Sequence, residues 1–121
     1  MKLLTPKYTL APEGEDRDQQ VAEWKEKYGS LNIKRISVQK AQFIEGAQGE
    51  AVAYIKKPGI ATMTVVAKVA ADEPMKAVKI MLNDCVLACD KEFCEDEQMY
   101  LELCQQFGEA RKVVGTEIKN G

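Results

Sequence analysis

Cysteines are the residues of this chain with the most specific chemistry, and no histidine accompanies them. Cys85, Cys89, Cys94 and Cys104 follow the spacing C-x3-C-x4-C-x9-C, which contains no C-x-x-C pair. Zinc knuckles use that shorter spacing because two thiolates two residues apart can point at one ion. Cys85 and Cys89 could still share a helix face, so a cytosolic four-cysteine zinc or thiol-redox module stays an alternative. The favoured interpretation is that the four are small apolar side chains packed in helices, and we predict no metal site.

The remaining reactive groups do not form a recognisable catalytic set. Without histidine, neither a Ser-His-Asp nor a Cys-His arrangement can form. The acidic stretch at residues 90–97 lacks the alternating ligands and central glycine of an EF-hand loop. The glycines at residues 46 and 49 do not follow the spacing of a phosphate-binding loop. The sequence therefore predicts no catalytic residue, no cofactor and no enzymatic activity.

Length and charge narrow the class of protein further. The chain has 121 residues, which fits one domain in the usual range of about 100–200 residues. Its 17 basic and 19 acidic residues give a net charge of −2, so nucleic acid is not an expected partner. We find no signal peptide and no stretch long enough to span a membrane, and we therefore expect a cytoplasmic protein without a membrane partner.

The first half of the chain has the patterns of an arm, a helix and two strands. Residues 1–12 contain two prolines and no periodicity, which predicts an extended arm or frayed end. Val21, Trp24 and Tyr28 share one face of a helix expected over residues 16–28. β-branched and aromatic residues before and after a glycine-containing break at 46–49 then predict an antiparallel strand pair.

The second half has the pattern of three helices. Residues 60–71 are ambiguous, although their length and alanine content favour a helix. Pro74 opens the next helix, whose apolar stripe continues from Met75 to Cys89. After an acidic connector, the last helix runs from Asp96 to Val114, with Gly115 as its stop. Its apolar face comprises Tyr100, Leu103, Phe107, Ala110 and Val114, with Val113 beside it.

These elements predict an α+β fold: a short antiparallel β-hairpin followed by a bundle of about three helices, with an extra amphipathic helix near the N-terminus. The expected organisation is an extended arm at 1–12, a single α+β domain at 13–115 and a frayed tail at 116–121.

The order of these elements, together with four short motifs, resembles a known family. The motifs are Glu23-Trp24-Lys25-Glu26-Lys27-Tyr28-Gly29, Tyr54-Ile55-Lys56-Lys57-Pro58, Asp72-Glu73-Pro74-Met75-Lys76-Ala77 and Leu82-Asn83-Asp84-Cys85. Over residues 23–114 the chain is similar to small tail-assembly-chaperone-like proteins of long-tailed phages and prophages. The resemblance implies a helix over residues 60–71 and a non-enzymatic role in the bacterial host cell. Its implied partners are the helical tape-measure protein and the tail-tube protein.

The resemblance also suggests where a partner would bind. A chaperone for a long helical partner needs an apolar strip with a charged border, and the segment 74–114 offers both. We expect Met75, Met81, Met99 and Tyr100 to contact the partner, because flexible thioethers can repack against varied surfaces. The competing interpretation is that the methionines fill the core, for which Val78, Leu82, Leu103 and Phe107 are the favoured residues. A small structural tail component or connector is the alternative function, and homo-oligomerisation stays open.

Overall fold

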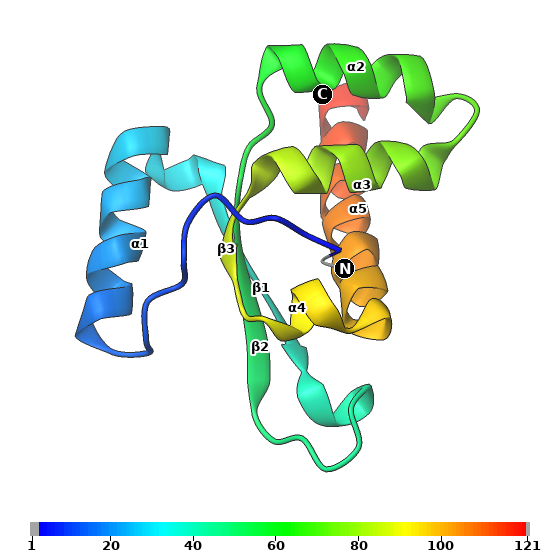
Figure 1. Cartoon of the computed structure of the whole chain (residues 1–121). Helices are drawn as coiled ribbons and strands as arrows, with labels where there is room; N and C mark the ends of the chain where they lie inside the picture. The colour runs from blue at the N-terminus through cyan, green and yellow to red at the C-terminus, as the bar shows by residue number, and fades with distance from the viewer. Residues whose placement is uncertain (1–2, 121) are drawn as a thin grey trace.

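An antiparallel sheet in the order β1-β2-β3 forms the centre of a computed structural model that describes the backbone of residues 3–120 and the side chains of residues 3–108. Helix α1 covers one face of the sheet and helices α4 and α5 cover the other (Figure 1). The expected α+β class is confirmed. The strands are β1 (Ile33–Gln39), β2 (Glu50–Lys56) and β3 (Val86–Cys89), and the helices are α1 (Glu15–Tyr28), α2 (Ile60–Ala70), α3 (Pro74–Cys85), α4 (Glu92–Glu95) and α5 (Glu97–Asn120).

Strand β2 lies in the middle of the sheet and is buried on both faces. Its residues from Ala51 to Ile55 are all buried, and successive side chains point to opposite sides. Ala51, Ala53 and Ile55 join the main core, whereas Val52 and Tyr54 pack in a smaller cluster with Trp24 of α1. The expected strand pair is therefore present, with β1 and β2 in antiparallel register from Ile33 opposite Lys56 to Gln39 opposite Glu50.

Strand β3 corrects the predicted helix that continued to Cys89. Helix α3 ends at Cys85 and the next four residues form β3, which pairs with β2 through Cys89 opposite Ala53, Ala88 opposite Tyr54 and Val86 opposite Ile55. Without β3, the second edge of β2 would leave buried amide and carbonyl groups without partners. The sheet therefore contains a third strand in addition to the predicted hairpin, and the helices do not follow it as one continuous bundle.

The N-terminal segment at residues 3–12 contains no helix or strand, and it is built into the fold. The Tyr8 amide donates to the Leu87 carbonyl at 2.7 Å and the Leu3 amide donates to the Cys94 carbonyl at 2.9 Å, so the arm lies beside β3 and α4. The Leu4 side chain is buried in the main core. The arm thus covers the outer edge of β3, which would otherwise be free to pair with another chain.

Contacts between aromatic rings connect the arm to α1 and to the sheet. The rings of Tyr8 and Trp24 lie 5.7 Å apart, and those of Trp24 and Tyr54 lie 5.6 Å apart. The hydroxyl groups of Tyr8 and Tyr28 lie at a hydrogen-bond distance of 3.0 Å. Trp24 is therefore a core residue that joins three separate segments of the chain.

Helix α5 extends beyond its expected end at Gly115 and includes residues 116–120, where a frayed tail was expected. A glycine in a helix interior costs only about 1 kcal/mol relative to alanine, so it does not by itself end a helix. The side chains of Ala110, Val113 and Val114 lie outside the described part of the chain, as does Gly121. The N-terminal helix and the helix at residues 60–71 are confirmed as α1 and α2.

Burial of Leu4 predicts that the arm contributes to stability. Leu4 is 1% exposed, whereas Leu31 is 95% exposed and provides a matched control. Leu4→Ala should lower the free energy of unfolding by about 2–5 kcal/mol, since it removes core contacts and leaves a cavity. Leu31→Ala should change it by less than about 0.5 kcal/mol. Urea denaturation followed by circular dichroism measures both changes. Equal free energies of unfolding for Leu4→Ala and Leu31→Ala would mean that the arm does not pack in solution.

Candidate partner-binding surface

Helix α2 lies outside the two layers that enclose the sheet and packs mainly against α3 (Figure 1). It begins after Pro58-Gly59, where the Met63 amide donates to the Gly59 carbonyl at 3.0 Å. Val66 is its one buried residue, and Met63 and Val69 pack partly against the core. With one main helical neighbour, α2 buries only one side.

A side-chain hydrogen bond fixes α2 against the end of α3. The Thr62 hydroxyl donates to the Asp84 carboxylate at 2.5 Å. At the other end, the Asp72 and Glu73 amides both donate to the Val69 carbonyl, which closes the turn into α3. The helix is therefore held at both ends, and the side turned away from α3 has a defined orientation.

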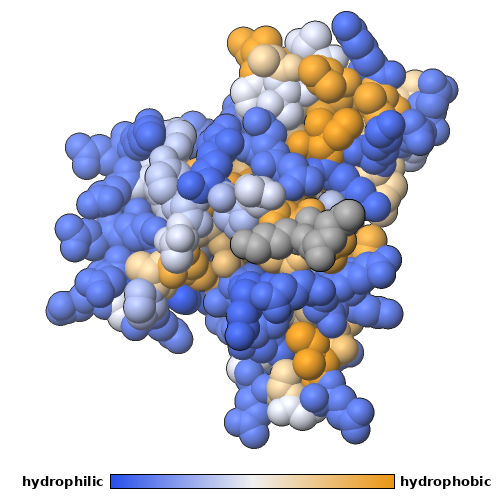
Figure 2. Space-filling model, viewed as in Figure 1, coloured by the Kyte–Doolittle hydropathy of each residue, from blue (hydrophilic) through white to orange (hydrophobic). Residues whose placement is uncertain are grey.

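The outward side of α2 is apolar. Ile60 is 88% exposed and Val65 is 50% exposed, and Met75 at the start of α3 is 48% exposed. Figure 2 shows hydrophobic residues gathered over the end of the molecule that α2 and α3 form. Within the described residues no helix is both long and apolar enough to cross a membrane. Exposed apolar residues that gather on one part of a surface are typical of a protein interaction site.

An open hollow lies along this side of α2, with a volume of about 650 Å³. Ile60, Met63, Thr64 and Ala67 fall at i, i+3, i+4 and i+7 and therefore share one helix face. Two lysines border the hollow, and no acidic residue lines it. We refer to this surface as the α2 face, defined by Lys57, Pro58, Ile60, Met63, Thr64, Ala67 and Lys68.

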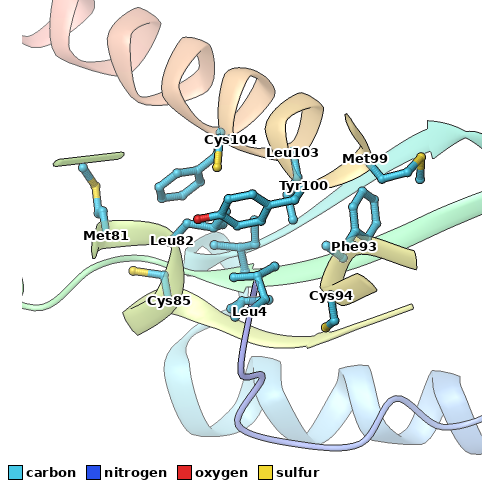
Figure 3. Close-up of a cluster of buried hydrophobic side chains, with 14 of the residues drawn as sticks. Leu4, Met81, Leu82, Cys85, Phe93, Cys94, Met99, Tyr100, Leu103 and Cys104 are labelled. Atoms are coloured by element: carbon cyan, nitrogen blue, oxygen red, sulfur yellow. The ribbon is translucent and has the colours of Figure 1, made fainter. Parts of the chain in front are cut away.

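Three of the four expected contact residues lie in the core instead of on a surface. Met81 is 8% exposed, Met99 0% and Tyr100 5%, and all three belong to the main cluster (Figure 3). The prediction placed them at the exposed edges of their apolar stripes. Helices α3 and α5 pack against each other and against the sheet, so these edge positions are buried as well. Only Met75 has the exposure that a contact residue requires. Leu82, Leu103 and Phe107 are buried as expected, and Val78 is partly buried against them.

The cysteines do not converge on one point. Among the described residues, no group of three or more histidine, cysteine, aspartate or glutamate side chains is placed to hold a metal ion. Cys85 and Cys104 are fully buried, and burial raises the pKa of the Cys104 thiol. Cys85 and Cys89 do not share a helix face, because Cys85 ends α3 and Cys89 ends β3. The sulfur atoms of Cys89 and Cys94 lie 3.7 Å apart.

Sequence reasoning missed the α2 face. The apolar residues of this helix occur around most of its circumference, a pattern that normally indicates burial on all sides. The feature that reveals this surface is an apolar helix with too few neighbouring elements to bury it. The number of neighbours is a property of the tertiary structure, so the pattern alone did not reveal the exposure of Ile60 or Val65.

The different burial of Met99 and Met75 predicts different effects of substitution on stability. Met99→Asp should unfold the protein or lower its free energy of unfolding by more than about 3 kcal/mol, because it places a charge without a partner in the core. Met75→Asp should leave the fold intact, since that side chain is half exposed. Circular dichroism and urea denaturation test both variants. A stable Met99→Asp protein would show that this position is not in the core.

Comparison with known proteins finds no match for this chain among protein-family models, curated proteins or solved structures. Its function is therefore inferred from the residues of the α2 face and their chemistry.

Proposed function

We propose that this protein is a non-enzymatic assembly chaperone that binds an amphipathic helical segment of a partner protein on the α2 face. The observation that carries the proposal is Ile60, which is 88% exposed at the end of an apolar helix face that the described side chains leave open. In line with the sequence resemblance, we propose the phage tape-measure protein as this partner and the tail-tube protein as a second one.

The shape of the α2 face supports a helical partner. Its apolar residues recur over two turns, which is the arrangement that receives the i, i+3, i+4 and i+7 side chains of a helix lying in a groove. The hollow is open along its length, so it accommodates side chains from a neighbouring protein better than it encloses a small molecule. Covering Ile60 and its neighbours would stabilise the complex by about 25 cal/mol for each Å² of apolar surface removed from water.

The charges around the α2 face indicate which charged residues the partner segment carries. Lys57 and Lys68 are exposed and flank the apolar residues, whereas Asp84 on the neighbouring helix is engaged by Thr62. A matching helix would therefore carry acidic residues beside its apolar strip. Such pairs at the rim act mainly on association rate and specificity, while the apolar contacts provide most of the affinity.

The central test of the proposal is a substitution at Ile60. Ile60→Asp should remain folded, because the side chain is exposed, and should weaken binding to a co-expressed tape-measure fragment by at least about tenfold. Leu31→Asp is the matched control, since Leu31 is a similarly exposed aliphatic residue outside the α2 face, and it should leave binding unchanged. Co-purification and titration calorimetry measure the effect. Unchanged binding by a folded Ile60→Asp protein would exclude the α2 face as the contact.

The lysine border predicts a dependence on salt. Binding of the same fragment should weaken as ionic strength rises, because salt screens exposed charge pairs. Lys68→Glu should slow association at low salt and reduce this dependence, whereas Lys34→Glu, an exposed position on β1, should leave both unchanged. Association rates measured across a salt series distinguish the outcomes. Equal salt slopes for the wild type and Lys68→Glu would contradict the proposed border.

A further inference from the structure

Two thiols meet where β3 turns into α4. The Sγ atoms of Cys89, the last residue of β3, and Cys94, in the middle of α4, lie 3.7 Å apart. Cys89 is partly exposed, whereas Cys94 is buried. In Figure 3 the Cys94 side chain points in the opposite direction from that of Phe93. Both residues belong to the main core, and the Cys94 sulfur lies beside that of Cys89.

The backbone around this pair holds both cysteines in place. Asp90, directly after Cys89, is paired twice with Val52 of the central strand: its amide donates to the Val52 carbonyl at 3.0 Å, and its carboxylate accepts from the Val52 amide at 2.7 Å. The Cys94 amide donates to the Lys91 carbonyl at 2.9 Å, which closes the turn. The two sulfurs therefore meet in a segment that is anchored to the sheet.

The remaining separation is small enough for a covalent bond. A disulfide has an S–S distance of about 2.05 Å, so the sulfurs must approach by less than 2 Å. Four residues separate the cysteines, and they comprise a short turn and the start of α4.

We propose that Cys89 and Cys94 form a reversible dithiol–disulfide site that reacts with low-molecular-weight disulfides such as oxidised glutathione. The Cys89 thiolate, formed when water takes the thiol proton, attacks one glutathione sulfur. A Cys89–glutathione bond forms, the glutathione disulfide breaks, and one glutathione thiolate leaves. The Cys94 thiol gives its proton to the released glutathione thiolate, and the resulting Cys94 thiolate attacks the Cys89 sulfur and releases the second glutathione. Two protein thiols are oxidised and one glutathione disulfide is reduced to two thiols.

The environment of the two thiols favours slow, switch-like disulfide formation over fast redox catalysis. Burial, the neighbouring Cys94 and the negative charge of Asp90 raise the pKa of the Cys89 thiol. Few thiolates are therefore present at neutral pH, and exchange is slow. A thiol of high pKa is also a poor leaving group, so the disulfide resists reduction once it has formed. It would join β3 to α4, whose Cys94 carbonyl accepts from Leu3 of the arm.

The test is oxidation of the full-length, reduced, folded protein with oxidised glutathione, followed by intact-mass measurement and peptide mapping. The wild type should lose the mass of two hydrogen atoms, yield a peptide linked through Cys89 and Cys94, and recover both hydrogens with dithiothreitol. Cys94→Ala should stop at one glutathione attached to Cys89. Cys104→Ala, which removes a cysteine outside the pair, should still form the disulfide.

Two results would overturn the proposal. One is a folded wild-type protein that gains glutathione on Cys89 but forms no internal link, and the other is a link that involves Cys85 or Cys104. Because Cys94 is buried and its alanine variant could unfold, Cys89→Ser supplies a second test at a partly exposed position. Cys89→Ser should form no internal disulfide while keeping the circular dichroism spectrum of the wild type. An internal disulfide in that variant would likewise exclude the pair.

Discussion

Burial of β2 on both faces is the constraint on which the rest of the structure depends. Five successive buried residues, from Ala51 to Ile55, require apolar cover on two sides of one strand. The amide and carbonyl groups of such a strand also need partners at both edges, because water does not reach them. Trp24 of α1 covers one side, the residues of α3, α4 and α5 cover the other, and β1 and β3 pair with the two edges. The arm in turn covers β3.

The same constraint explains why α2 remains outside. The main core is closed by side chains from α3, α4 and α5 together with one face of the sheet, and α2 contributes only Val66 as a fully buried residue. Met63 and Val69 are partly buried against the core, whereas Ile60 and Val65 are exposed. A chain that satisfies its own core and still presents an apolar helix face has surface available for a partner, which is the basis of the proposed chaperone role.

The turn from β3 into α4 joins several parts of this arrangement. Asp90 connects the turn to the central strand, Phe93 fills the core, and the Cys94 carbonyl accepts a hydrogen bond from the arm. The dithiol pair lies in this turn, some distance along the chain from the helix that carries the α2 face. The two proposals therefore rest on different residues and are tested by different variants, so the failure of one leaves the other standing.

The sequence by itself determined the elements whose periodicity is local, namely the helix at α1 and the strand pair β1 and β2, whereas it left residues 60–71 ambiguous and only favoured the helix found at α2. It also identified Leu82, Leu103 and Phe107 as core, because they lie at the centres of their apolar stripes. Tertiary structure alone decided that residues 86–89 are a strand, that Met99 is buried while Ile60 is exposed, and that Cys89 meets Cys94. The physical reason is that a pattern shows which side of an element is apolar, whereas the neighbour that covers that side comes from a distant part of the chain.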